Sequence, residues 1–159
     1  ENNQNSEDKI KWTVTITGGT GFRLPTEAEW EYACRAGTTT AFHYGNSLDG
    51  SMANFNSWRP YDAVKSSFRG KTTVVGSFSP NAWGLYDMHG NISEWCWDWY
   101  KEYYNSSAIN DPGGADSGSY RVRRGNSWQN DGHTLRSAYR SFGYSKSFVT
   151  GFRVVRSAN

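Results

Sequence analysis

Residues 21–37 read GFRLPTEAEWEYACRAG, and this stretch contains the clearest secondary-structure signal in the sequence. Thr26 is a favourable N-cap, and Glu29 stands three residues later, which is the spacing of a capping box. Trp30 shares one helical face with the apolar residues three and four positions further along. Gly37 is placed to end the helix, because glycine readily adopts the left-handed conformation that follows a helix. The stretch therefore predicts a helix that begins after Thr26 and ends before Gly37.

The chain has 159 residues, the usual size of one domain, and can bury a core without disulfides or metals. It contains 8 Trp, 10 Tyr and 8 Phe, so aromatic rings must fill much of that core. The formal net charge of +2 argues against a dedicated nucleic-acid protein, and the short apolar runs argue against a membrane span. We expect residues 1–10 to form a flexible or processed tail and residues 11–159 to form a single domain.

The rest of the sequence predicts short strands separated by long irregular segments. Alternating apolar residues predict strands at 11–17, 94–100, 120–124, 135–140 and 151–156. Trp95, Trp97 and Trp99 share one face of the second of these strands, and we expect them to belong to the core. Residues 38–79 show no periodicity, and we expect packed rings to order them. The rings are those of Phe42, Tyr44, Phe55 and Trp58.

Charge is distributed unevenly along the chain. Residues 121–156 contain seven Arg and one Lys against a single acid, a net charge of +7, whereas residues 1–120 contain nine basic and fourteen acidic residues. One interpretation is a basic nucleic-acid face. The other, which we favour, is that C-terminal arginines pair with acids of the first part, because the planar guanidinium suits partly buried carboxylates. The arginines in question are Arg124, Arg136, Arg140 and Arg153, and the acids are Glu29, Glu31, Glu94 and Asp98.

Three groups of residues resemble the signatures of one known family. They are residues 21–33 quoted above, NAWGLYDMHGNISEW at 81–95, and a C-terminal group of RRGNSW at 123–128, RSAYR at 136–140 and GFR at 151–153. Together they resemble the formylglycine-generating enzyme (sulfatase-modifying factor) family over about residues 21–156. The resemblance implies an α+β, C-type-lectin-like fold with few helices, a small twisted antiparallel sheet and much ordered loop.

The cysteines that this family's oxidase chemistry uses are absent. Members that make formylglycine carry a cysteine pair between the two arginine motifs, where the pair binds copper and activates oxygen, and copper of this kind needs soft thiolate ligands. Here no cysteine stands between Ser127 and Arg140. We therefore expect no enzyme activity of this type.

The remaining cysteines and histidines favour structural roles. Cys34 and Cys96 could form one disulfide or remain two buried thiols, and their spacing does not decide between the two. His43, His89 and His133 are isolated and lack the spacing of a metal-binding pair. An enzyme of the formylglycine-generating type whose chemistry has moved to Cys34 or Cys96 is the first alternative function.

No cofactor is expected, although the resemblance leaves calcium open. In the family, an Asn and a Glu of the GNxxEW signature can bind Ca²⁺ together with backbone oxygens. Asn91 and Glu94 match this pattern, and Asn54 lies near the family's other calcium segment. Hard oxygen ligands suit the ion. A turn at Asn91 and an ion pair between Glu94 and an arginine would explain the same residues equally well, so no metal site is assigned.

Two segments of the variable region (about 121–156) form the predicted binding surface: residues 126–134, here the first loop, and residues 141–150, here the second loop. They are rich in Tyr, Ser, Gly and Asn, the mixture that antibody paratopes use. Exposed rings at Phe142 and Tyr144 would be costly unless they bind something or pack inward. A fixed arginine-rich framework around free-form loops resembles the variable proteins of diversity-generating retroelements, of the Treponema variable protein type.

This second resemblance implies which residues contact the ligand. They are Asn126, Trp128, Asn130, Asp131, Gly132, His133, Thr134, Ser141, Phe142, Gly143, Tyr144, Ser147, Phe148, Val149 and Thr150. The rings of Trp128, Tyr144 and Phe148 would be anchors. The polar selectors would be Asn130, Asp131, His133 and Thr150. Asn126 stands where the family usually has glycine, and we expect it to face outward.

The sequence therefore predicts a non-catalytic, receptor-type variable protein that displays diversified residues on a rigid lectin-like scaffold. The expected partner is an unidentified protein or surface ligand rather than nucleic acid, and the expected state is a monomer. The resemblance also implies display at the cell surface as a lipoprotein, with membrane contact only through an anchor outside this chain. A basic nucleic-acid binder is the second alternative, and its affinity would fall steeply with salt.

Overall fold

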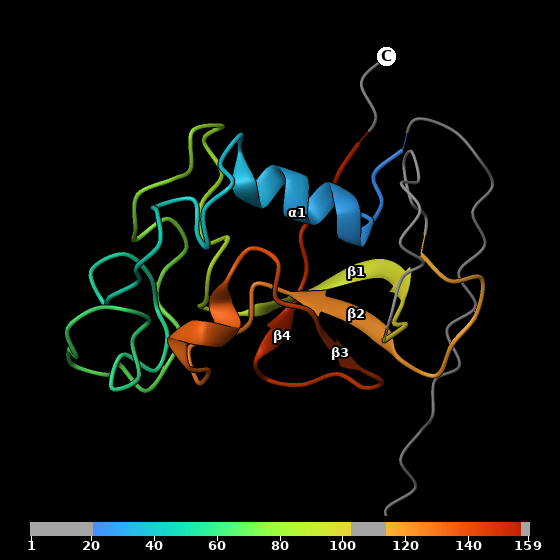
Figure 1. Ribbon diagram of the computed structural model, residues 1–159. Helices are drawn as coiled ribbons and strands as arrows, with labels where there is room; N and C mark the ends of the chain where they lie inside the picture. The colour runs from blue at the N-terminus through green and yellow to red at the C-terminus, as the bar shows by residue number, and fades with distance from the viewer. Residues whose placement is uncertain (1–20, 103–113, 157–159) are drawn as a thin grey trace, which may run out of the picture.

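The computed structural model describes residues 21–102 and 114–156, which form one helix, a four-stranded sheet and long ordered loops (Figure 1). The elements are α1 (Glu27–Arg35), β1 (Ser93–Trp99), β2 (Arg121–Arg124), the 3-10 helix η1 (Gly132–Leu135), β3 (Ser141–Gly143) and β4 (Thr150–Gly151). The predicted tail at 1–10 and the predicted strand at 11–17 lie outside the described residues. Within the described ranges, no helix is long and apolar enough to cross a membrane.

Helix α1 forms where the sequence predicts it and for the predicted reason. The Thr26 hydroxyl accepts the N–H of Glu29, and the Glu29 carboxylate accepts the N–H of Thr26 at 2.8 Å, which completes the capping box. The helix ends at Ala36, which adopts the left-handed conformation one residue before the predicted Gly37. Its apolar face packs against β1 and β2, so α1 covers one face of the sheet (Figure 1).

The strands lie in the order β3-β2-β1-β4. β2 is antiparallel to both β1 and β3, whereas β1 and β4 are parallel. The sheet is therefore mixed, and not antiparallel throughout as the sequence analysis predicts. The chain passes through β2, η1 and β3 before it returns to β1 as β4. This path supplies the long connection that a parallel pair requires.

Two predicted strands differ from the observed structure. Residues 135–140 form the end of η1 and a turn instead of a strand. The N–H of Ser137 donates to the carbonyl of Ala41 at 2.8 Å, and its own carbonyl accepts from an arginine of β2, so its backbone has no group left for a strand ladder. Of the predicted strand at 151–156, only β4 and a single bridge at Val155 form.

The prediction that Trp95, Trp97 and Trp99 belong to the core is wrong. All three are half-buried on the face of β1 that points away from α1. The residues on the buried face are Glu94, Cys96 and Asp98. Strand side chains alternate between two faces, and here the face that carries the acids is the one that packs inward. This arrangement is stable because partners from α1 and from the C-terminal segment satisfy the acids.

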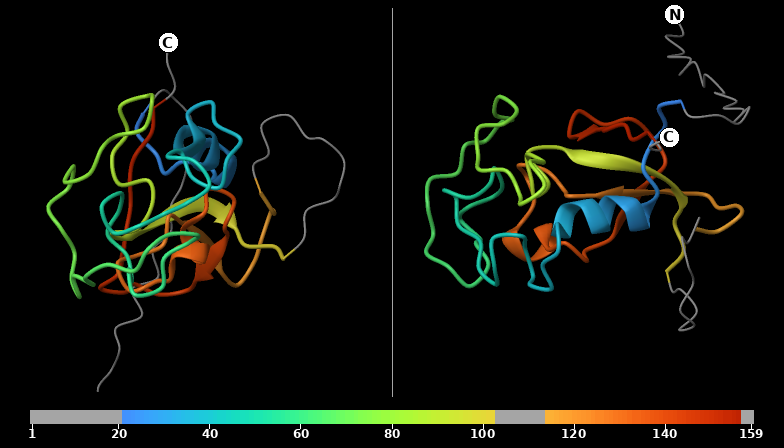
Figure 2. Two further views of the ribbon diagram at one scale, coloured as in Figure 1. Left: turned by 60° about the vertical axis from the view of Figure 1, so that its left-hand side comes forward. Right: turned by 90° about the horizontal axis from the view of Figure 1, so that it is seen from above.

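Two clusters of buried side chains form the apolar core. The first comprises Trp30, Cys34, Met88, Cys96 and Val122, and the second comprises Phe42, Leu48, Ala53, Phe55 and Leu135. The second cluster confirms that packed rings order the long segment after α1, although Tyr44 is only half-buried and Trp58 is 59% exposed. These loops extend the molecule beyond one end of the helix and sheet (Figure 1 and Figure 2).

Arginine–carboxylate pairs connect the C-terminal part of the chain to α1 and β1, as the charge distribution predicts. The pairs are Arg124 with Glu27 and Glu31, Arg140 with Glu27, and Arg153 with Glu94. The Arg124 side chain is fully buried. Because a buried charge is costly unless it is paired, its carboxylate partners are needed to stabilise it there. Glu27 is a partner that the sequence did not indicate, and the predicted pairing of Arg136 does not form, because Arg136 is exposed and donates to the carbonyl of His133. Two predicted acids also have other partners: Glu29 pairs with Arg23, and Asp98 accepts the backbone N–H of Glu27.

Candidate functional site

The first and second loops meet at the start of β1. The N–H of Trp128 in the first loop donates to the carbonyl of Asn91 at 3.2 Å. The N–H of Ser93 donates to the carbonyl of Val149 in the second loop at 2.9 Å. The two predicted binding segments therefore contact positions that are two residues apart, Asn91 just before β1 and Ser93 at its start.

Bonds within the first loop and to its neighbours hold it in place. The amide oxygen of Asn130 accepts the N–H of Ser127 at 3.0 Å and its hydroxyl at 2.8 Å. Asp131 pairs with Arg59 at 3.0 Å. Gly132 is buried, and a Cβ atom there would lie 2.8 Å from a backbone nitrogen of the facing loop. Asn130 and Asp131, predicted as contacts for a ligand, thus use their polar atoms to fix the loop.

Asn126 does not face outward as predicted. It is 5% exposed and has a φ of 54°, in the left-handed region that glycine and asparagine tolerate best. Its side-chain amide donates to the carbonyl of Thr134 at 2.8 Å and so closes the first loop. Asparagine replaces the expected glycine because it accepts the same backbone conformation and adds a hydrogen bond.

Trp128 is half-buried at one end of a row of aromatic rings. Its ring centroid lies 5.8 Å from that of Phe68, which lies 5.1 Å from that of Trp58. Trp58 is the most exposed ring of the three, whereas Phe68 and Trp128 are half-buried. The row thus forms a partly exposed apolar surface next to the first loop. Trp58, which the sequence assigned to internal packing, thus belongs to the surface around a predicted anchor.

The second loop exposes its rings. Tyr144 is 81% and Phe148 78% exposed, whereas Phe142 packs its ring 4.4 Å from that of Tyr100 and 5.0 Å from that of Tyr120. Tyr144 and Phe148 are therefore open to a ligand, and Phe142 mainly contributes to a ring cluster at the edge of the sheet.

The predicted site residues consequently fall into three exposure classes. His133, Phe142, Tyr144 and Phe148 are exposed. Trp128, Asn130, Asp131, Thr134, Ser141, Gly143, Ser147, Val149 and Thr150 are half-buried. Asn126 and Gly132 are buried.

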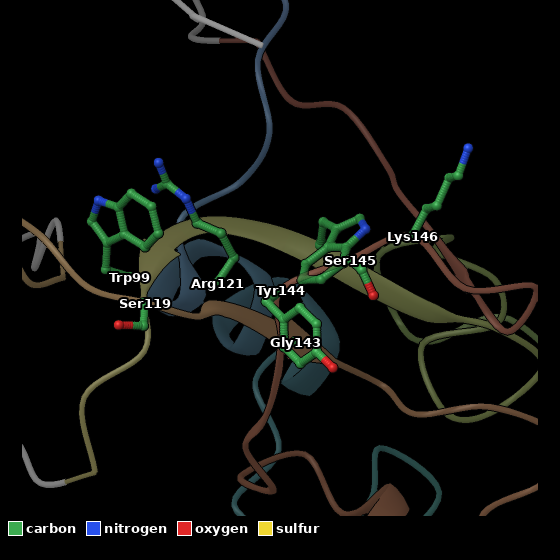
Figure 3. Close-up of a pocket in the computed structure, with 8 residues that line it drawn as sticks. Trp99, Ser119, Arg121, Gly143, Tyr144, Ser145 and Lys146 are labelled. Carbon is green, nitrogen blue, oxygen red and sulfur yellow. The ribbon is translucent and has the colours of Figure 1, made fainter. Parts of the chain in front are cut away.

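A pocket of about 330 Å³ opens on the outward face of the sheet beside the second loop (Figure 3). It is lined by Trp95, Trp99, Ser119, Arg121, Gly143, Tyr144, Ser145 and Lys146. The sequence analysis named only Gly143 and Tyr144 as site residues. For Trp95 and Trp99 the alternation along β1 indicates a shared face, but it does not show that this face lies outward.

The two thiols are free and buried. Burial raises the pKa of Cys34 to about 12, and it also raises the pKa of Cys96 far above its usual range. A nucleophilic or metal-binding cysteine needs an accessible site that stabilises the thiolate. Neither Cys34 nor Cys96 has such surroundings.

His89 is a buried, neutral residue of the core. Its Nδ1 lies 2.7 Å from the carbonyl of Leu135, and its Nε2 accepts the N–H of His43 at 3.3 Å, so the ring proton belongs to Nδ1. Burial lowers the pKa of His89 to about 3 and that of His43 to about 4. Among the described residues, no three or more His, Cys, Asp and Glu side chains gather in a way that could hold a metal ion.

The candidate calcium ligands already have partners, with one exception. The side-chain oxygen of Asn91 accepts the side-chain amide of Asn54 at 3.1 Å and a backbone N–H at 2.9 Å. Glu94 accepts from the indole of Trp30 at 2.6 Å and from Arg153 at 2.6 and 2.7 Å. The side-chain oxygen of Asn54 is buried without a hydrogen-bond partner in the described chain. Calcium here stays a prediction, and it would require Glu94 to exchange an arginine for the ion.

Comparison with known proteins identifies the family. The model of the sulfatase-modifying factor enzyme 1-like domain matches residues 3–158. The chain belongs to this family. It is 40% identical over 127 residues to the formylglycine-generating enzyme of Bos taurus, which covers 75% of this chain and 34% of that protein. It is 39% identical over 159 residues to a protein of Chlamydia pneumoniae named serine/threonine-protein kinase pkn1, with 92% of this chain and 24% of that protein covered.

A solved structure confirms the C-type-lectin-like fold predicted for this sulfatase-modifying factor domain. Treponema denticola variable protein 1 matches with a TM-score of 0.71 at 34% identity, over 85% of this chain and 47% of that chain. Both predicted resemblances, to the enzyme family and to a variable protein, are thus confirmed. The chain spans between a quarter and a half of the length of these relatives.

The segment that holds the cysteine pair in the active enzymes differs in this chain. The segment between Ser127 and Arg140, where the active enzymes hold their cysteine pair, forms most of the first loop and η1 here and contains no cysteine. The residues present therefore do not fit a copper–thiolate centre.

Proposed function

We propose that this chain is a non-catalytic, receptor-type variable protein that binds its ligand through the second loop and the adjoining surface. The observation that carries the proposal is the exposure of Tyr144 and Phe148, at 81% and 78%. Large rings held outward on an ordered loop favour a binding role, because a cluster of exposed apolar surface commonly marks an interaction site. Aromatic anchors of this kind dominate the energy of protein interfaces.

The scaffold beneath the loop supports this role. The segment that joins the two loops is held by the buried Arg124, which donates to the carbonyl of Ser137 at 2.6 Å and pairs with Glu27 on α1 at 3.0 Å. The far end of the second loop forms β4 beside β1. Rings presented from a fixed backbone lose little conformational freedom on binding, which favours affinity.

The variable-protein similarity supports a diversified surface, an unidentified protein or surface ligand, and a monomer displayed at the cell surface as a lipoprotein. Sequencing of the DNA that flanks the gene tests the diversification. We expect a second, near-identical copy of the segment that encodes residues 121–159, different only where the template has adenine, beside a reverse-transcriptase gene. A flanking sequence without such a copy would remove diversification from the proposal.

A double substitution tests the surface itself. Phage-displayed peptides are selected on the whole chain, and their affinity is compared with that for Y144A/F148A. We expect the double variant to bind about 30-fold more weakly, since two lost anchors at about 1 kcal/mol each amount to about 2 kcal/mol. The matched control is F22A/Y32A, which removes two rings that are 72% and 70% exposed elsewhere. Equal weakening in both variants, or none in Y144A/F148A, would contradict the proposal.

The rival function is an oxidase of the formylglycine-generating type, which the identity with the bovine enzyme favours. The raised pKa of Cys34 and the burial of both thiols argue against it. Titration with Cu(I) separates the two functions. Stoichiometric copper binding that disappears in C34S or C96S would support the oxidase, and binding that is unchanged or absent would support the binding protein.

A further inference from the structure

The outward face of the sheet combines tryptophans of β1 with arginines of β2. In the strand register, Trp95 stands beside Arg123 and Trp99 beside Arg121. The guanidinium carbon of Arg121 lies 3.5 Å from the centroid of the Trp99 ring, and that of Arg123 lies 5.5 Å from the Trp95 ring. Both distances lie within the range of cation–π contacts, in which the face of the ring attracts the cation.

Glycine at position 143 lets side chains pack closely against β3 beside the pocket. Gly143 is the register partner of Arg121 on β3. A Cβ atom there would lie 2.9 Å from the far edge of the Trp95 ring and 3.1 Å from the guanidinium of Arg123. The missing side chain therefore allows Trp95 and Arg123 to approach the backbone of β3, and Tyr144 and Lys146 of the second loop also line the pocket (Figure 3).

The cations of this face lack carboxylate partners. Arg121 donates to the carbonyl of Trp97, and Arg123 donates to the carbonyl of Phe142 and the hydroxyl of Thr150. Across the described ranges, neither arginine forms an ion pair with an acid, and neither does Lys146. The inward-facing Arg124 of the same strand has two.

Burial also makes the positive charges of Arg121 and Arg123 energetically unfavourable. Desolvation lowers the pKa of Arg121 and of Arg123, although Asp98 on the other face of the sheet partly offsets this for Arg121. The Nε atom of Arg123 is buried without an acceptor in the described part of the chain. An incoming anion would supply the counter-charge that Glu27 and Glu31 of α1 give to Arg124.

We propose that this pocket binds carboxylate side chains of an acidic protein ligand, with Arg121 contacting one carboxylate and Lys146, which extends away from Arg121 on the other side of the pocket (Figure 3), contacting another. The inference rests on the proposed function and names the chemistry of the ligand, because Tyr144 belongs to both the exposed loop and the pocket. The planar guanidinium carries paired N–H donors, and these match the two oxygens of a carboxylate. Arg and Tyr side by side are also typical of protein interfaces.

The same geometry disfavours a nucleic-acid ligand. Unpaired bases bind by stacking on exposed aromatic faces. The face of Trp99 is already covered by Arg121 at 3.5 Å, and Trp97 is covered by the same guanidinium at 5.1 Å. Arg121 therefore already lies over both of these rings, which disfavours stacking of bases on β1.

The experiment uses the whole chain, labelled with ¹⁵N, and two defined probes: acetyl-tetraglutamate amide and its uncharged counterpart, acetyl-tetraglutamine amide. We expect saturable shifts of the Trp99 indole N–H and the Arg121 Nε–H with the glutamate peptide only. The dissociation constant should rise about tenfold in R121M and in K146M, as loss of a charge-assisted hydrogen bond predicts. Because Lys146 is exposed, K146M tests the pocket even if R121M fails to fold.

The control variant is R136M, since Arg136 is an exposed arginine away from the pocket, and its affinity should equal that of the unchanged protein. Three results would overturn the inference: equal binding of the glutamine peptide, unchanged affinity in K146M, or a response to inorganic phosphate without one to the glutamate peptide. Peptides selected by phage display distinguish a failure of this inference from a failure of the proposed function. If they lose affinity in Y144A/F148A but keep it in R121M and K146M, the binding protein stands and the carboxylate pocket falls.

Discussion

The first and second loops have similar compositions, yet the structure uses them differently. In the first loop, Asn126, Asn130 and Asp131 direct their polar atoms to the loop itself or to neighbouring segments. In the second loop, Tyr144 and Phe148 extend into solvent. Composition identified both as binding segments, but only contacts with distant residues show that one is braced and the other displays its side chains.

The physical origin of the difference is what each loop packs against. The first loop lies on the segment that contains Arg59, and its buried Gly132 donates to the carbonyl of that residue at 2.8 Å. The second loop begins with an edge strand, β3, and ends in the opposite edge strand, β4. A loop that joins two edges has fewer neighbours to satisfy its side chains, so its rings stay free for a ligand.

The largest expected effect comes from the side chain that holds the segment between the two loops. R124A leaves Glu27 and Glu31 without their buried cation and the carbonyl of Ser137 without its donor. We expect the free energy of unfolding to fall by about 3–5 kcal/mol, as for other broken buried ion pairs. Urea denaturation measures it. R136A, in the same segment but exposed, should change stability by less than about 0.5 kcal/mol, and equal losses in both variants would contradict this account.

Acid should destabilise the base of the first loop, where His89 binds the carbonyl of Leu135. Its pKa falls from an ordinary 6.5 to about 3 in the folded state, so the unfolded chain takes up the proton first. Stability should be complete above about pH 6.5 and decrease towards pH 3, by up to about 1.4 kcal/mol per pH unit.

Urea midpoints measured between pH 7 and pH 4 check this dependence. H89Q should reduce the slope at the cost of stability at pH 7, and the slope that remains should come from His43, whose pKa also falls, to about 4. H133Q, at an exposed position of the first loop, should keep the slope of the unchanged protein. A slope in H89Q as steep as that of the unchanged protein would contradict the assignment to His89.

The smallest expected effect is the difference in lost stability between alanine substitutions at two glycines, one in each loop. G132A places a Cβ 2.8 and 2.9 Å from backbone atoms of the facing loop, which cannot move aside, and should cost about 1–3 kcal/mol. G143A meets the ends of the Trp95 and Arg123 side chains, which can shift, and should cost less than about 1 kcal/mol. Thermal denaturation compares them, and G143A should in addition weaken binding of the glutamate peptide. A larger loss of stability in G143A would reverse the assignment of braced and displaying loops.

The local parts of the fold could be predicted because their causes are local. The capping box of Thr26 and Glu29 and the alternation along β1 depend on residues a few positions apart. The arginine–acid pairing was also predictable, since charge excess in one part and deficit in another requires compensation. The turn at Ser137 was not, because its partners Ala41 and Arg124 are distant in sequence.

By itself, the sequence determined the family, the helix, the absence of the oxidase cysteines and the two loops of interest. The tertiary structure decided which face of β1 lies outward, that Asn126 is buried, and that Trp95, Arg121 and Lys146 share a pocket. Periodicity shows that a strand has two faces but not which one packs inward. That choice depends on whether partners elsewhere satisfy the buried groups. Here the arginines and α1 satisfy the acids, and the tryptophans lie on the outward face of the sheet.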